Sequence, residues 1–68
     1  MTTMGEYDVV RLKRALPEHQ LAAGMIGTIL LVYNNGAAFE VEFCDRDGMT
    51  LALLAIERDD LELVVRFS

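Results

Sequence analysis

A hairpin is the structure that most constrains this chain, because two runs of strand-forming residues stand only three residues apart. The runs are Met25–Tyr33 and Ala37–Cys44, and Asn34-Asn35-Gly36 separates them. Asparagine and glycine readily take the positive φ angles that a tight hairpin turn needs. The sequence therefore predicts an antiparallel strand pair in the middle of the chain.

The second run also indicates which way its side chains point. Phe39, Val41 and Phe43 alternate with Glu40 and Glu42. Successive side chains of a strand point to opposite sides of the sheet. This run is therefore expected to bury its phenylalanines and valine and to leave its glutamates in water.

The rest of the chain predicts three more strands and their connections. Strands are expected over about Tyr7–Lys13, Met49–Ile56 and Leu61–Phe67, which are rich in β-branched and other large apolar residues. Arg14–Gly24 has no strand pattern and forms a long connection, with room for one helical turn after Pro17. Turns are expected at Asp45–Gly48 and at Glu57–Asp60, the second as a short turn or a single 3₁₀ turn.

Five short strands in this order predict an all-β fold, a small five-stranded SH3-like barrel in which the fifth strand returns beside the first. The 68 residues suffice for a single domain, residues 1–68, with residues 1–5 as a disordered tail. Sheets this small are not stable alone, so their inner faces must share one core. The expected core residues are Val9 or Val10, Ile29, Phe39, Val41, Phe43, Leu51, Leu53 and Val65.

Strands two and four carry more large apolar residues than one buried face can hold. In Met25–Tyr33 and in Met49–Ile56 both parities carry them, so an apolar outer surface is expected whichever side faces the core. The alternative is that frayed strand ends, the long connection and alanines account for the surplus. The residues expected at an interface with a second copy or a partner protein are Ile26, Leu30, Leu31, Glu40, Glu42, Leu54 and Ile56.

Composition narrows the possible partners. Eleven acidic and six basic residues give a net charge of −5, which repels a phosphate backbone and argues against nucleic acid as the main partner. The apolar runs are far shorter than the roughly 20 residues of a membrane-spanning helix, and the start lacks a signal-like pattern. With a single cysteine, these features predict a cytoplasmic protein without a membrane partner.

Charged residues gather near the first and last strands, and we expect the two groups to be neighbours. They are expected to pair within the barrel or across a dimer axis, with solvated surface charge as the default because exposed ion pairs contribute little. The basic group is Arg11, Lys13 and Arg14, and the acidic group is Glu57, Asp59, Asp60 and Glu62.

No residue pattern indicates catalysis, a metal or a cofactor, so the protein is expected not to be an enzyme. His19, the only histidine, has no nucleophile or orienting carboxylate fixed beside it. One histidine and one cysteine, Cys44, cannot complete a zinc site, and Cys44 is expected to be a structural side chain rather than a reactive thiol. Asp45–Gly48 begins like a calcium loop, but Ile56 stands where the twelfth position needs glutamate.

A family resemblance is carried by three stretches, YDVVRLKRALPEHQLAAGMIGTILLVY, FEVEF and DGMTLALLAI, followed by a closing acidic turn. In this order they resemble a family of short bacterial proteins catalogued only as a domain of unknown function. The resemblance covers about Tyr7–Leu63, and its most specific part is Leu16–Thr28. It implies an SH3-like barrel with a role in binding or assembly, and it brings no activity, cofactor or catalytic residue.

Three hypotheses about function follow. The first is a non-enzymatic protein-binding or assembly module that self-associates or docks a partner protein through its apolar outer face. The second is the small acidic partner, antitoxin-like, of a two-gene bacterial module. The third rests on Gly24, Gly27 and Thr28, which are similar to the glycine-bearing strand start of KOW barrels, and it predicts nucleic-acid binding.

Overall fold

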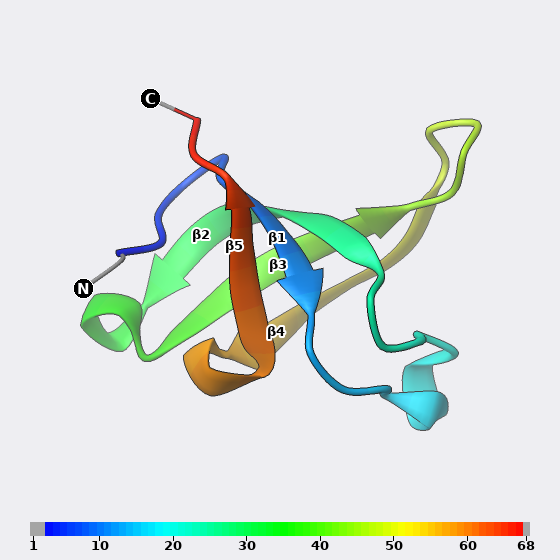
Figure 1. Cartoon of the computed structure of the whole chain (residues 1–68), viewed down its shortest axis with the longest axis horizontal. Coiled ribbons are helices and arrows are strands. Elements are labelled where there is room, and N and C mark those ends of the chain that lie inside the picture. Colours follow the sequence, from blue (N-terminus) through cyan, green and yellow to red (C-terminus); the bar gives the residue numbers. More distant parts are fainter. Residues whose placement is uncertain (1–2, 68) are drawn as a thin grey trace.

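The computed structural model describes residues 3–67 and forms one antiparallel sheet of five strands (Figure 1). The sheet has the order β4-β3-β2-β1-β5, so the last strand lies beside the first. This arrangement confirms the predicted all-β fold, a small SH3-like barrel. The strands are β1 (Val9–Leu12), β2 (Ile26–Tyr33), β3 (Ala38–Cys44), β4 (Thr50–Glu57) and β5 (Leu61–Val65).

Three short turns, η1 to η3, lie between the strands, and a turn was predicted at each of these places. The turn η1 (Pro17–His19) begins at the proline of the long first connection, and η3 (Arg58–Asp60) joins β4 to β5. The turn η2 (Asn34–Gly36) closes the central hairpin with φ angles of +50°, +58° and +98°. Such angles suit asparagine and glycine, which explains why these residues stand there.

One core lies on the concave side of the sheet. Of the expected core residues, Val10, Ile29, Phe39, Val41 and Phe43 are buried, which confirms the parity predicted for β3. Four further residues complete the core: Leu12, Leu21, Ile56 and Leu61.

The expected core was wrong on β4 and β5. Leu51 and Leu53 are each 51% exposed, and Val65 is 56% exposed. On β4 the buried parity is the other one, because Leu54 lies opposite Val41 and Leu53 opposite Glu42. On β5 the register shifts where the strand pairs with Val9 and Val10, which turns Val65 away from the core.

The two ends of the described chain are fastened to each other. The Asp8 carboxylate, only 4% exposed, accepts hydrogen bonds from the Gly5 N–H at 2.9 Å and the Phe67 N–H at 2.7 Å. The rings of Tyr7 and Phe67 meet edge to face at a centroid distance of 5.4 Å. Residues 1 and 2 of the expected tail lie outside the described residues, whereas Met4 packs against the core.

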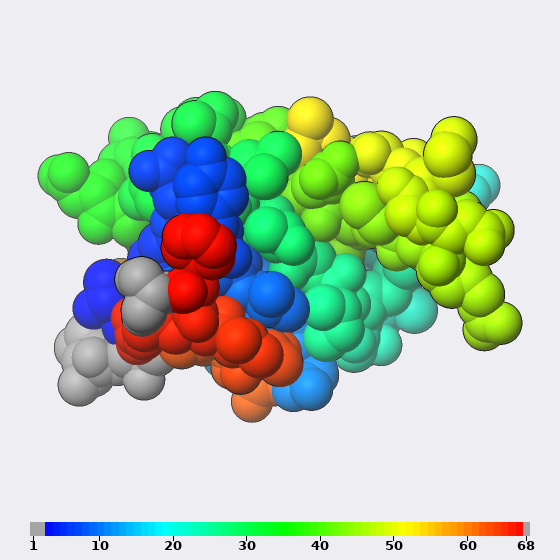
Figure 2. All heavy atoms as spheres, turned by 90° about the horizontal axis from the view of Figure 1, so that it is seen from above, coloured from blue at the N-terminus to red at the C-terminus, as the bar shows by residue number. Residues whose placement is uncertain are grey.

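The β3–β4 hairpin extends beyond the body of the molecule. Its tip projects away from both ends of the chain (Figures 1 and 2). Asp45 holds the tip together, since its Oδ1 accepts the N–H groups of Asp47 and Met49, each at 2.9 Å. We call residues 44–53 the arm. No helix among residues 3–67 has the length and hydropathy to cross a membrane.

Candidate protein-binding surface

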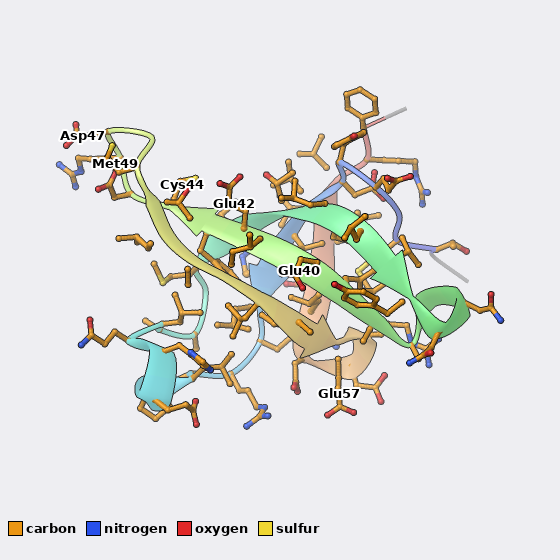
Figure 3. All side chains as sticks on the ribbon, turned by 180° about the vertical axis from the view of Figure 1, so that it is seen from behind. Glu40, Glu42, Cys44, Asp47, Met49 and Glu57 are labelled. Carbon is orange, nitrogen blue, oxygen red and sulfur yellow. The ribbon has the colours of Figure 1, made fainter. Side chains whose placement is uncertain are left out.

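The convex side of β2, β3 and β4 carries a continuous set of side chains, which we call the outer face. The strand register aligns it in rows across the sheet: Thr28, Glu42 and Leu53 form one row, and Leu31, Glu40 and Ala55 form the next. Figure 3 shows Glu40 and Glu42 along β3, with Cys44 nearer the tip of the arm. The outer face consists of Thr28, Leu31, Tyr33, Ala38, Glu40, Glu42, Cys44, Thr50, Leu51, Leu53, Ala55 and Glu57.

Large apolar side chains are exposed on this face. Leu31, Leu51 and Leu53 are each about half exposed, and Tyr33 is also exposed. At the arm tip Met49 is 67% exposed, which extends the apolar area toward the end of the hairpin. Single exposed apolar residues are ordinary, but several on one side of one sheet make this face the candidate for contact with another protein.

The two glutamates are held in place by hydroxyl groups of the neighbouring strands. The Tyr33 hydroxyl donates to Glu40 Oε1 at 3.0 Å, and the Thr50 hydroxyl donates to Glu42 Oε2 at 2.6 Å. Fixed carboxylates between apolar side chains would orient a partner rather than supply most of the affinity. The same hydrogen bond to Glu40 raises the pKa of Tyr33, with smaller contributions from desolvation and from the charge of Glu40.

The raised pKa of Tyr33 gives a direct check on this part of the outer face. In a Tyr7→Phe background Tyr33 is the only tyrosine, and its phenolate absorbance can be titrated alone. The Glu40→Gln substitution is expected to lower the pKa of Tyr33 toward its ordinary value, because the neutral amide accepts a weaker hydrogen bond. Glu42→Gln is the matched control and should leave the titration unchanged.

The sign of the pH effect follows from the direction of the shift. A pKa raised by folding means that the Tyr33–Glu40 contact contributes stability below the ordinary tyrosine pKa. That contribution is lost as the pH rises through the pKa of the folded protein. An identical phenol titration with and without the Glu40 carboxylate would contradict the role assigned to this hydrogen bond.

The predicted interface residues do not all lie on the outer face. Leu31, Glu40 and Glu42 do, whereas Ile56 is a core residue and Leu54 packs against the core, so both were assigned to the wrong side. Leu30 is the extra residue where the β2–β3 register shifts, and it is half-buried. Ile26 is exposed and points to the same side of β2 as Thr28, so it lies at the border of the outer face, opposite Arg11 on β1.

Sequence reasoning missed Leu51 and Leu53 as surface residues. Leu53 is paired with Glu42 across the two strands, so the side chains of both residues point to the solvent side of the sheet. The glutamates of β3 were therefore a usable signal, because residues paired across an antiparallel ladder point to the same side. Using the signal requires the register, which the sequence alone left open.

A shallow groove runs along β4 on the side away from β3. Its volume is about 260 Å³, and apolar residues of β4 form one wall while the first connection forms the other. The lining residues are Arg14, Leu16, Glu18, His19, Leu54, Ala55, Ile56, Glu57 and Asp60. A second hollow of about 350 Å³ lies near Lys13 and Arg58 and has a mostly charged lining.

The expected charge clusters pair within the barrel. Arg11 Nη1 lies 2.9 Å from Glu62 Oε1, and Arg14 Nε lies 3.0 Å from Asp60 Oδ1. The hydrogen bond and the charge of Asp60 raise the pKa of Arg14. These pairs join the first connection and β1 to the last part of the chain, and they are exposed enough to contribute little stability.

Within residues 3–67 no three His, Cys, Asp or Glu side chains are grouped as metal ligands would be. Cys44 is an exposed free thiol on the arm, and His19 is exposed on η1.

Comparison with known proteins identifies the sequence family of the chain. A family model described as a domain of unknown function, DUF4926, matches residues 6–63. The chain belongs to the DUF4926 family. No curated protein and no solved structure matches it. The DUF4926 match contains β1 to β4 and therefore every residue of the outer face.

Proposed function

We propose that this DUF4926 protein is a non-enzymatic protein-binding or assembly module that associates with a second copy of itself through the outer face. The observation that carries the proposal is the set of half-exposed leucines, Leu31, Leu51 and Leu53, on one side of one sheet. A domain of this size has a small core, and association is a common way for such domains to gain stability.

The expected strength of association follows from the exposed area. Full burial of a leucine contributes about 1.5–3 kcal/mol, so covering a half-exposed leucine contributes roughly 1 kcal/mol. Three leucines and Tyr33 from each of two copies then contribute about 6–8 kcal/mol before the costs of association, which are about 4–15 kcal/mol. At the low end of these costs about 4 kcal/mol remains, so we expect a weak complex with a dissociation constant of about 1 mM.

A double substitution on the arm tests the proposal. Leu51→Glu with Leu53→Glu places two charges on the outer face beside Glu42, and we expect it to weaken association at least about tenfold. Both positions are exposed, so the lone chain should keep its fold, which circular dichroism checks. The measurement is the mass from light scattering over a concentration series.

The matched control is Val65→Glu, because Val65 is equally exposed but lies on β5 at the other edge of the sheet. The dissociation constant of this variant should equal that of the unchanged chain. If the arm variant and the control associate alike, the outer face is not the binding surface.

A cytoplasmic setting in bacteria is part of the same proposal. It is supported by the single cysteine, Cys44, whose exposed thiol suits a reducing compartment.

A further inference from the structure

The outer face has an acidic centre between apolar borders. Glu40 and Glu42 lie on β3, the middle strand of the face, about 7 Å apart along the strand (Figure 3). Leu31 stands beside Glu40 on β2, and Leu53 stands beside Glu42 on β4. The two carboxylates therefore lie between leucines of the two neighbouring strands.

The charges of the outer face all have one sign. Among residues 3–67 its only charged members are glutamates, and every lysine and arginine lies elsewhere. The basic residues nearest along the chain are Arg46, in the turn at the arm tip, and Arg58, which is 3.7 Å from Asp59. At the border, Arg11 is already paired with Glu62. The face thus offers negative charge and apolar area together.

The two central carboxylates are held in place and still have room for a partner. The hydroxyls of Tyr33 and Thr50 each donate to one oxygen, Oε1 of Glu40 and Oε2 of Glu42. An ionised carboxylate accepts up to about four hydrogen bonds, so each group retains acceptor capacity. Bonds from lysine or arginine are the strong ones, and a side chain fixed in advance loses less freedom on binding.

A second copy meets this face with the same charges. A two-fold interface uses the same patch on both partners. If it covers the leucines of β2 and of β4, it also covers β3 between them, and the glutamates of both copies enter it. Like charges then oppose each other without a base between them. This repulsion keeps self-association weak, in line with the dissociation constant of about 1 mM expected above.

We propose that the preferred occupant of the outer face is a protein surface in which lysine or arginine side chains stand between apolar ones. Its apolar side chains cover Leu31, Leu51 and Leu53, and its basic groups bond to Glu40 and Glu42. The inference rests on the proposed function, because it uses the same face. It names the partner that binds there more tightly than a second copy and displaces it.

A charge-reversed form of the chain is the probe for this preference. Glu40→Lys with Glu42→Lys keeps every leucine of the outer face and gives it a basic centre. We expect this probe to bind the unchanged chain at least about tenfold more tightly than the unchanged chain binds itself. The measurement is an NMR titration of the isotope-labelled unchanged chain, followed at its outer-face amides. Circular dichroism checks that the probe is folded.

The matched control carries the same change of net charge away from the outer face. Glu18→Lys with Asp59→Lys replaces two exposed carboxylates, on η1 and η3. Both variants exchange two acids for two lysines, so their net charges are equal. We expect the control to bind the unchanged chain less than about threefold more tightly than the unchanged chain binds itself, because distant exposed charges are screened at about 0.15 M salt. Equal binding by probe and control would overturn the inference.

The outcomes separate this inference from self-association. An unchanged chain that dimerises, but binds the probe no better than the control, overturns the basic partner and leaves the proposed function standing. An unchanged chain that stays at 7.6 kDa alone, yet binds the probe at least about tenfold more tightly than the control, supports the basic partner and overturns self-association.

A neutral pair of variants decides if the probe does not fold. Glu40→Gln with Glu42→Gln removes the repulsion between two copies and should self-associate more tightly than Glu18→Gln with Asp59→Asn, which has the same net charge. Light scattering over a concentration series compares the two. Equal masses at every concentration would overturn the inference.

Discussion

Replacing Asp8 with alanine is expected to lower the free energy of unfolding by about 3 kcal/mol, because two part-buried N–H groups lose a buried, charged acceptor. Those groups belong to Gly5 and Phe67, at opposite ends of the described chain. A domain of 68 residues has a total stability of about 3–10 kcal/mol, so the loss is a large fraction of it. Urea denaturation followed by circular dichroism measures the change.

Two further variants show whether the Asp8 carboxylate itself is responsible. Asp8→Asn keeps one acceptor oxygen but turns an NH₂ group toward the other donor, so we expect an intermediate loss. Asp59→Ala removes a carboxylate whose side chain is 92% exposed and should change stability by less than about 0.5 kcal/mol. An Asp8→Ala variant as stable as Asp59→Ala would show that the two hydrogen bonds do not hold the chain ends.

Gly27→Val is expected to lower the free energy of unfolding by about 3 kcal/mol or more. A Cβ atom at Gly27 would stand 2.7 Å from Val41 Cγ1, 2.9 Å from Phe43 Cε1 and 3.0 Å from the Glu42 carbonyl oxygen. The two side chains are core residues with no exposed surface, and the carbonyl belongs to the neighbouring strand. Overfilling a packed site of this kind costs about 1–3 kcal/mol, and the two methyl groups of valine add to that.

The smaller substitution and a matched glycine test the steric cause. Gly27→Ala should cost about 1–3 kcal/mol, despite the stiffer backbone that alanine brings. At Gly5 an added Cβ meets no atom within 4 Å, so Gly5→Ala should stay within about 0.5 kcal/mol of the unchanged chain. Equal stabilities for the Gly27 and Gly5 alanine variants would mean that β2 and β3 separate easily at this point.

The sequence was most informative where polar and apolar residues alternate without exception. On β3, Phe39, Val41 and Phe43 are buried and the intervening glutamates are on the outer face, as their alternation predicts. The turn Asn34–Gly36 could be predicted for a similarly local reason, because few residues take three successive positive φ angles.

Strand β4 shows why its contribution to the outer face could not be predicted. Its residues Leu51, Leu53, Leu54 and Ile56 are apolar on both parities, so hydrophobicity does not choose a buried side. The choice is made by pairing with β3, whose register shifts between Phe43 and Cys44. A shift of one residue exchanges the two faces of a strand, which is why Leu53 and Leu54 were assigned the wrong way round.

The contacts of Asp8 and Gly27 lie beyond sequence reasoning for a different reason. Asp8 bonds to residues at both ends of the chain, and Gly27 is crowded by side chains of another strand. Neither residue belongs to a local pattern, and each takes its role from a neighbour far away in the sequence. The apolar surface predicted on β2–β4 therefore included Leu31 and the glutamates of β3 correctly. On β4 it included Leu54 and Ile56, whereas the exposed residues are Leu51 and Leu53.

Sedimentation equilibrium of the unchanged chain tests self-association most directly. The weight-average mass is expected to rise from 7.6 kDa toward twice that value as the concentration is raised to about 1 mM. The Leu51→Glu, Leu53→Glu variant should stay near the mass of one chain over the same range. A constant mass of 7.6 kDa for the unchanged chain would contradict the proposal.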